Sequence, residues 1–121
     1  MEKRILVVDD EEIFRKALET LFVRAGYSVQ CAGSAEEALA VVEKESFLVI
    51  FLDLFLPKMD GVELCRRLRE RFPQAVIYAV TGHAVRYESE DCRQAGFTRC
   101  LAKPVNIAEL LKAAAEGFGG A

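Results

Sequence analysis

The chain has no tryptophan, one histidine and three prolines among its 121 residues, and its apolar runs are short. No run approaches the ~20 apolar residues that a membrane-spanning helix needs. Met1 to Arg4 leads directly into a four-residue apolar segment, which is too short for the core of a signal peptide. We therefore expect a cytoplasmic protein that does not insert into a membrane.

An excess of basic residues is also missing, since the net charge is −3. Binding to nucleic acid needs a basic stripe that neutralises phosphates, so the composition predicts no direct contact with nucleic acid. Four arginines gather in one segment but alternate with Glu63 and Glu70, which is typical of a solvated helix face. These arginines are Arg66, Arg67, Arg69 and Arg71.

The cysteines show no Cys-x-x-Cys pair, and the single His83 cannot complete a zinc site with them. We expect all four to be buried thiols in a reducing compartment. A redox role for Cys100 is the minor alternative. The four residues are Cys31, Cys65, Cys92 and Cys100.

Strand-like and helix-like segments alternate five times, without a linker or a repeat. We expect strands at 4–8, 27–31, 48–52, 75–80 and 98–102, and helices at 11–25, 35–44, 61–72, 84–94 and from 107 onward. This alternation predicts βαβ units and a parallel sheet. Five strands favour a flavodoxin-like, doubly wound α/β fold of the (βα)5 type with strand order 2-1-3-4-5. We expect residues 1–121 to form one domain, with 117–121 as a tail or the start of a linker.

Helix ends and faces can be predicted in part. The helix at 11–25 has apolar residues at helical spacing, which we place on a buried stripe from Ile13 to Phe22. Segment 48–52 is apolar throughout, as expected of a central strand buried on both faces. Three helices begin after a residue that can cap an N-terminus. These residues are Ser34, Asp60 and Asn106. Ser34 also has Glu37 three residues on, which is the pattern of a capping box.

Polar residues follow four of the expected strands. Asp9 and Asp10 end the first strand, Asp53 the third, Thr81 the fourth and Lys103 the fifth. In open α/β sheets ligands bind outside the carboxyl ends of the strands, at the point where the strand order reverses. That point lies between strands 1 and 3, so the fold and the residues select the same crevice.

Three carboxylates in one crevice repel each other, so some must hold protons unless a cation lies among them. Mg²⁺ is typically bound by one or two carboxylates together with waters and a phosphate. The competing interpretation of Asp9 and Asp10 is an ordinary acidic loop before a helix. Asp53 emerges from the core at a fixed place, and a carboxylate there can attack phosphorus to form an aspartyl phosphate.

The remaining residues of the crevice suit a phosphoryl group. Thr81 offers a hydroxyl donor, and Gly82 beside it leaves room and a free backbone N–H. Lys103 is a compact cation within reach of a phosphoryl oxygen, unless it is an ordinary surface amine. The bond to Pro104 is of the type in which cis peptides occur, which would fix where Lys103 points.

Four sequence pieces together resemble a response-regulator receiver domain of the CheY-like family, over nearly the whole chain. They are Ile5-Leu-Val-Val-Asp-Asp10, Asp53-Leu-Phe-Leu-Pro-Lys-Met-Asp-Gly61, Thr81-Gly82 and Lys103-Pro104. The Asp-x-x-x-Pro-x-x-Asp-Gly string is the most specific of them. The resemblance implies a phosphorylation-dependent switch in two-component signalling.

The resemblance also implies residue roles. Asp53 would be the phosphoacceptor. Asp10 would bind Mg²⁺ directly, Asp9 would bind it partly through water, and the backbone carbonyl of Phe55 would be a further ligand. Thr81 would supply the hydroxyl that moves toward the phosphoryl group, and Lys103 the amine that forms an ion pair with it. The implied phosphodonor is a histidine kinase or a histidine phosphotransfer domain. The implied readout is a downstream protein or tethered output domain, with a dimer through the fourth-helix, fifth-strand and fifth-helix face.

Three positions depart from the family pattern. Cys100 stands where the family usually has an aromatic that turns inward, which predicts a different or weaker readout. Phe55 and His83 flank the phosphoryl group, where the family tunes its lifetime. We hypothesise that Phe55 shields the acyl phosphate from water, the alternative being a partly exposed loop residue. His83 is expected to be a bystander.

Three functions compete. The first is the phosphorylation switch, an enzyme only in promoting its own phosphorylation and dephosphorylation. The second is a degenerate receiver that binds partners without phosphate, which Cys100 keeps open. The third, a phosphohydrolase or flavoprotein on the same fold, is disfavoured because the first strand lacks an Asp-x-Asp nucleophile pair and no Ser/Thr/Gly-rich phosphate loop follows it.

Overall fold

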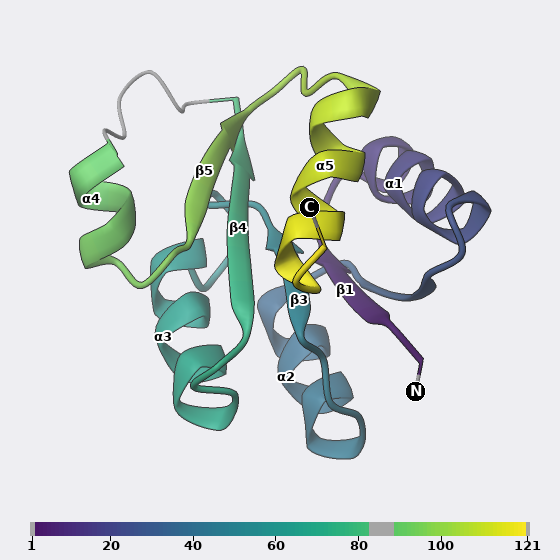
Figure 1. Cartoon of the computed structure of the whole chain (residues 1–121). Helices are drawn as coiled ribbons and strands as arrows, with labels where there is room; N and C mark the ends of the chain where they lie inside the picture. Colours follow the sequence, from purple (N-terminus) through teal and green to yellow (C-terminus); the bar gives the residue numbers. More distant parts are fainter. Residues whose placement is uncertain (1, 83–88, 121) are drawn as a thin grey trace.

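The computed structural model describes residues 2–82 and 89–120 and contains a five-stranded sheet whose strands are all parallel (Figure 1). The strand order is β2-β1-β3-β4-β5, as the sequence predicts, which confirms the flavodoxin-like fold. The strands are β1 Arg4–Val8, β2 Ser28–Ala32, β3 Val49–Leu52, β4 Val76–Thr81 and β5 Arg99–Ala102.

Helices cover both faces of the sheet. They are α1 Glu12–Arg24, α2 Ala35–Lys44, α3 Gly61–Arg71, α4 Ser89–Gln94 and α5 Ile107–Gly117. The buried side chains of α2, α3 and α4 share one hydrophobic cluster with alternate residues of the strands, and those of α1 and α5 share the other. Figure 1 shows α1 and α5 on the right of the view, and α3 and α4 on the left. The predicted first part of α4, residues 84–88, lies outside the described residues.

The strands divide their side chains between the two clusters. In β1, Ile5 and Val7 face α1 and α5, while Leu6 and Val8 face the other layer, and all four are at most 1% exposed. This alternation with continuous burial is expected of a central parallel strand. Leu48 is a correction, because it precedes β3 and is 53% exposed.

Three predicted helix caps are present. The Glu37 N–H donates to Ser34 Oγ at 3.1 Å, and the Glu63 N–H donates to Asp60 Oδ1 at 2.9 Å. Asn106 Oδ1 accepts from the N–H of Glu109 at 2.7 Å. Such caps typically contribute about 1 kcal/mol each to helix stability.

The predicted buried stripe of α1 is partly wrong. Ile13 is 88% exposed, whereas Leu18 and Phe22 are buried. At 100° per residue Ile13 lies on the opposite side of the helix from Phe22, so spacing alone placed it on the wrong face. Phe14 is the partly buried residue that continues the stripe.

The arginines of α3 divide into two pairs, and only one matches the predicted solvated face. Arg66 and Arg67 form exposed ion pairs with Glu63. Arg69 instead donates to the carbonyls of Pro73, Ala75 and Gly96, and Arg71 donates to those of Val42 and Glu43. The second pair therefore ties α3 to neighbouring segments.

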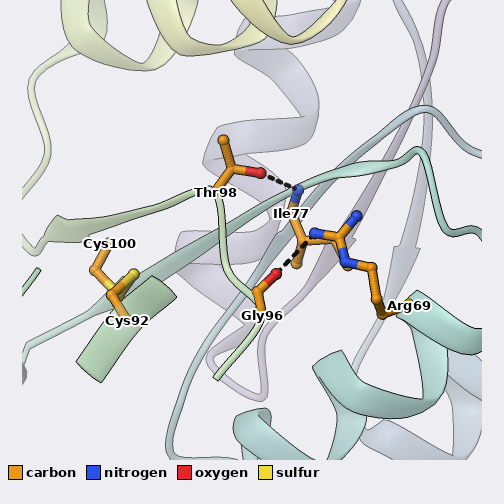
Figure 2. Close-up of a disulfide and its surroundings, with 6 residues drawn as sticks. All are labelled: Arg69, Ile77, Cys92, Gly96, Thr98 and Cys100. Atoms are coloured by element: carbon orange, nitrogen blue, oxygen red, sulfur yellow. Dashed lines mark hydrogen bonds between the residues drawn. A yellow bond between two sulfur atoms is a disulfide. The ribbon is translucent and has the colours of Figure 1, made fainter. Parts of the chain in front are cut away.

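The cysteine prediction is wrong for one pair, because Cys92 in α4 and Cys100 in β5 form a disulfide (Figure 2). The turn between α4 and β5 brings them together, with Cα atoms 6.2 Å apart. Cys65 is a buried free thiol as predicted, but Cys31 is only half-buried.

Among the described residues, no helix has both the length and the apolar character needed to cross a membrane.

A row of aromatic rings crosses the α1/α5 side of the core. Phe51 packs against Phe22 and Tyr78, each with ring centroids 5.0 Å apart. The buried Tyr78 hydroxyl donates to the carbonyl of Ala113 at 2.7 Å. This bond attaches α5 to the middle of β4.

Candidate acidic site at the carboxyl edge of the sheet

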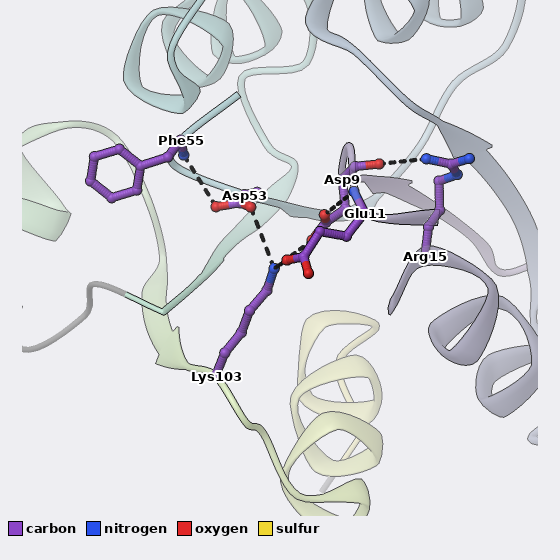
Figure 3. A network of polar contacts seen from close by, with 6 residues as sticks. All are labelled: Asp9, Glu11, Arg15, Asp53, Phe55 and Lys103. Carbon is purple, nitrogen blue, oxygen red and sulfur yellow. Dashed lines mark hydrogen bonds and ion pairs between the residues drawn. The ribbon is translucent and has the colours of Figure 1, made fainter. Parts of the chain in front are cut away.

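The predicted site residues converge at one edge of the sheet because backbone hydrogen bonds continue past the strand ends. The N–H of Asp53 donates to the carbonyl of Val8 at 3.0 Å, joining the ends of β3 and β1. The N–H of Lys103 donates to the carbonyl of Thr81 at 2.9 Å, joining the ends of β5 and β4. The structure thus brings Asp9, Asp53 and Lys103 together, as Figure 3 shows.

Asp9, Asp10 and Asp53 form an acidic cluster in which one oxygen of each carboxylate lies within 4.8 Å of the other two. Asp9 and Asp53 are only 2% and 7% exposed, while Asp10 is exposed. Three hard oxygen donors in this arrangement fit a small divalent cation such as Mg²⁺.

Two of the carboxylates are oriented by their own loops. Asp9 Oδ1 accepts from the N–H of Glu11 at 2.8 Å, and Asp53 Oδ1 accepts from the N–H of Phe55 at 3.1 Å. Both are the bonds of an Asx turn, in which a side chain binds the backbone two residues on. Each bond leaves the second oxygen of the carboxylate turned toward the crevice (Figure 3).

Lys103 supplies a positive charge to the cluster. Its Nζ lies 2.9 Å from Asp9 Oδ2, 2.8 Å from Glu11 Oε1 and 3.4 Å from Asp53 Oδ2. The same ammonium lies 4.3 Å from the ring centroid of Phe14, a cation–π contact. Burial alone would lower the pKa of Lys103, but the hydrogen bonds that its ammonium donates to Glu11 and Asp9 outweigh this effect and raise the pKa.

The pKa of Asp9 is raised, mainly by burial and only to a small extent by the neighbouring carboxylate. Burial raises its pKa above the ordinary value, against the opposing effects of the Glu11 N–H and the Lys103 ammonium, which lower it. The nearby charge of Asp53 adds a smaller upward effect. The pKa of Glu11 is lowered by its hydrogen bond to Lys103. Lys103 is therefore a cation lying among the carboxylates.

Gly61 fixes the loop behind the phosphoacceptor candidate. A Cβ at Gly61 would lie 2.5 Å from the carbonyl oxygen of Asp53 and 2.6 Å from the Cα of Leu54. The Gly61 N–H also donates to the Leu54 carbonyl at 2.7 Å. Only glycine lets the start of α3 lie this close to the backbone of Asp53.

Thr81 is the last residue of β4, and its side chain is fully buried. The bond between Lys103 and Pro104 is cis, one of the two isomers that the sequence left open. Cys100 lies in β5 opposite Ala79. His83 lies outside the described residues.

Phe55 is 57% exposed, and its ring points away from the Asp53 carboxylate (Figure 3). Its backbone N–H donates to Asp53 Oδ1 at 3.1 Å. The predicted role of its carbonyl in metal binding stays a prediction.

Three residues of the site were missed. Glu11 was assigned only to the helix start but pairs with Lys103, and Phe14 lies against the same ammonium. Arg15 Nη1 donates to the backbone carbonyl of Asp9 at 2.7 Å. The sequence spacing gives no signal for the contacts of Lys103, because Glu11 and Phe14 lie about ninety residues away from it. It gives none for Arg15 either, because Arg15 binds a backbone carbonyl, which every residue type offers.

A more apolar hollow of about 540 Å³ lies elsewhere, at the amino ends of β1 and β3. Ligand pockets are usually large and apolar. This hollow contains none of the predicted site residues, whereas the acidic cluster combines perturbed titratable groups with convergent oxygens. We therefore assign the chemistry to the acidic cluster.

Comparison with known proteins shows the family of the chain. Residues 5–115 match the family described as the response regulator receiver domain. The chain is 36% identical to the sensory/regulatory protein RpfC of Xanthomonas campestris, over 93% of the chain and 16% of that protein. It spans less than half the length of the curated relatives it matches.

Solved structures give the same family. A CheY-like response regulator receiver domain protein from Methanospirillum hungatei is 34% identical, with a TM-score of 0.92 over 98% of this chain and 95% of that one. A response regulator from Burkholderia pseudomallei, solved with a phosphorylated aspartic acid, a calcium ion and citrate, is 32% identical. Its TM-score is 0.82 over 98% of this chain and 72% of that one.

Proposed function

The chain belongs to the family of response regulator receiver domains, and from this premise we propose that it is a phosphorylation-dependent signalling switch. The observation that carries the proposal is the position of Asp53. Its carboxylate lies within the acidic cluster, 3.4 Å from the Lys103 ammonium, and one of its oxygens is already held by a backbone N–H. A carboxylate fixed in this way is suited to form an acyl phosphate.

In the proposed reaction, a carboxylate oxygen of Asp53 attacks the phosphorus of a phosphohistidine. The new O–P bond forms as the P–N bond breaks, and the imidazole nitrogen keeps the electron pair. The protein contributes by positioning and by neutralising charge, which dominate catalysis of phosphoryl transfer. The Asx turn at Asp53 positions the nucleophile, and Lys103 pairs with a phosphoryl oxygen.

Mg²⁺ is the cofactor that the cluster fits. Asp9, Asp10 and Asp53 would hold it, together with the backbone carbonyl of Phe55. When bound, the ion supplies neutralisation of the charge that develops on the phosphoryl oxygens. The phosphorylated aspartic acid and calcium ion of the Burkholderia pseudomallei relative support an acidic aspartyl-phosphate site of this kind.

Phosphorylation of Asp53 would add about −1.5 to −2 charges at the crevice. Lys103 and the hydroxyl of Thr81 are then drawn toward the new anion. These two residues end β5 and β4 and share a backbone hydrogen bond, so their movement reaches the face made by α4, β5 and α5. This face is the proposed contact for a downstream protein, a tethered output domain or a second copy.

The proposed phosphodonor is a histidine kinase or histidine phosphotransfer domain. Three large apolar side chains are exposed at the edge of the sheet that carries the acidic cluster. They are Ile13, Phe55 and Ile107, exposed by 88%, 57% and 63%. They follow β1, β3 and β5, so a partner that places its phosphohistidine in line with Asp53 would cover them.

The protein would catalyse only its own phosphorylation and dephosphorylation. We place this activity in the cytoplasm, in a single domain of residues 1–121 that contacts no nucleic acid itself.

Phosphotransfer from a phosphorylated histidine donor, with and without Mg²⁺, tests the proposal. We expect Mg²⁺-dependent labelling that Asp53→Asn abolishes. Asp60→Asn is the matched control, because Asp60 is an exposed cap of α3 and asparagine is an equally good cap. Labelling that persists in the Asp53→Asn variant, or that is the same with and without Mg²⁺, contradicts the proposal.

A phosphate-independent interaction module is the second candidate, which the replacement of an aromatic by Cys100 favours. Mg²⁺ titration by calorimetry separates the two. Mg²⁺ binding that becomes weaker in the Asp10→Asn variant supports the switch. Binding of a partner by a protein that does not bind Mg²⁺ supports the module.

A further inference from the structure

We propose that Cys92 and Cys100 form a reversible thiol–disulfide modification site that limits how far α4 can move relative to β5. The chemical part of this inference stands on the cysteine geometry alone. The part that concerns signalling rests on the proposed function, because it is the proposed switch that would move this face of the protein.

The two cysteines join separate elements. Cys92 lies in α4 and is 2% exposed, and Cys100 lies in β5 and is half-buried. Their Cα atoms are 6.2 Å apart, within the usual range for a disulfide. Figure 2 shows the bond crossing from the helix to the strand beside it.

The turn between them is anchored independently of the sulfur atoms. The Thr98 N–H donates to the Ile77 carbonyl at 2.7 Å, and the Ile77 N–H donates to Thr98 Oγ1 at 3.2 Å. Arg69 Nη2 donates to the carbonyl of Gly96 at 2.7 Å (Figure 2). These contacts hold the turn against β4 and α3, so the two thiols remain neighbours after reduction and the ring can close again.

The difference in exposure orders the chemical steps when the oxidant is a small disulfide such as glutathione disulfide. The Cys100 thiolate attacks one sulfur of the oxidant, and a glutathione thiolate leaves. The Cys92 thiolate then attacks the Cys100 sulfur of the mixed disulfide and releases the second glutathione thiolate. Two protein thiols lose two protons and two electrons, and one oxidised glutathione becomes two reduced molecules.

The crosslink lies next to the proposed switch. Cys100 pairs with Ala79 in the sheet, two residues before the pairing of Thr81 with Ala102. Lys103 follows directly. A covalent tie from this strand to α4 opposes any separation of helix and strand that movement of Thr81 and Lys103 would require.

The remaining cysteines are internal controls. Burial raises the pKa of the Cys31 thiol to about 11 and that of the Cys65 thiol to about 11. A high pKa keeps a thiol protonated and slow to react. The structure pairs neither with another cysteine.

The chemical part is tested by equilibrating the full chain in glutathione redox buffers, then alkylating it and measuring its mass. We expect a reversible loss of two hydrogen atoms, mapped to a peptide that joins Cys92 to Cys100. Cys92→Ala and Cys100→Ser each remove the change, while Cys31→Ser and Cys65→Ser retain it. Wild-type protein that stays fully reduced in excess oxidised glutathione, or stops at the mixed disulfide, overturns the inference.

The signalling part is tested by amide NMR shifts on adding Mg²⁺ and beryllofluoride to the reduced and oxidised protein. We expect shifts around Asp53 in both states, and loss of the shifts in α4 and β5 only in the oxidised state. Equal responses overturn the control by the disulfide. Absence of any response in either state overturns the proposed function instead, while the mass measurement still decides the thiol chemistry.

Discussion

The two halves of the carboxyl edge of the sheet are built differently. After β1 and β3, the carboxylates are fixed by backbone hydrogen bonds within their own loops, and Gly61 lies directly behind Asp53. After β4 and β5, a backbone hydrogen bond from Lys103 to Thr81 joins the strand ends, and side chains make the further links, from the Lys103 ammonium to the carboxylates and from Cys92 to Cys100. The first half is therefore a fixed receptor, and the second half is connected by links that chemistry can change.

The glycines show the same contrast. A Cβ on Gly61 would collide with backbone, whereas a Cβ on Gly82 would meet no described atom within 4 Å. Backbone atoms thus occupy the position beside Gly61, whereas no described atom occupies the corresponding position beside Gly82.

The largest expected effect is that of Gly61→Ala. The new methyl group must displace the backbone of Asp53 or Leu54, so we expect a loss of about 3 kcal/mol in the free energy of unfolding. Mg²⁺ affinity falls as well. Urea denaturation and Mg²⁺ titration measure the two changes. Gly82→Ala is the matched control, and an equal loss there would remove the contrast between the halves.

Arg69→Met should rank second. The change removes charged hydrogen bonds to the carbonyls of Ala75 and Gly96, which we expect to cost about 2 kcal/mol of unfolding free energy. Arg67→Met removes only an exposed ion pair with Glu63 and should change stability by about 0.5 kcal/mol or less. Similar chemical denaturation midpoints for the two variants would contradict the assignment of Arg69 as a structural tie.

The third change, Asp9→Asn, should alter stability less than the first two and should increase it. Burial raises the pKa of Asp9 above the ordinary aspartate pKa of 3.8. The stability that protonated Asp9 contributes is therefore fully present when the pH is below 3.8, and it is lost as the pH rises through the raised pKa. Asp9→Asn should therefore raise the melting temperature at neutral pH without divalent cation, and should flatten the decline of stability with pH. Thermal melts across acidic to neutral pH test this. Asp60→Asn, which changes an exposed cap, should show neither effect.

The smallest expected effect on stability is that of Phe55→Asn, since the ring is mostly exposed. If the ring shields the acyl phosphate, the change shortens the lifetime of phosphorylated Asp53, measured by loss of label after the donor is removed. Val23→Asn changes a similarly exposed apolar residue near the carboxyl end of α1 and should leave the lifetime unchanged. An unaltered lifetime in Phe55→Asn would agree with the ring lying away from the carboxylate and end the shielding hypothesis.

The strand order and the converging polar residues could be predicted because they depend on local patterns. Apolar runs mark the strands, and parallel strands place Asp9, Asp53 and Lys103 at the same edge. The helix caps at Asp60 and Asn106 are local as well. In contrast, the phase of α1 was misjudged at Ile13, because several apolar residues fit a helical spacing and only packing selects among them.

Several of the contacts that were missed join distant parts of the chain. Arg69 binds a carbonyl 27 residues away, and Lys103 binds Glu11 across 92 residues. A carbonyl acceptor leaves no mark in the sequence, because every residue has one. The Cys92–Cys100 bond depends on how one short turn folds, which the spacing of eight residues does not determine.

The position of Lys103 has a consequence for how the crevice fills. When ionised, Asp9, Asp10, Asp53 and Glu11 carry four negative charges, and the ammonium within this group already offsets one of them. A divalent ion held by Asp9, Asp10 and Asp53 would then compete with the Lys103 ammonium for the oxygens of Asp9 and Asp53, while Glu11 would still offer the ammonium a partner.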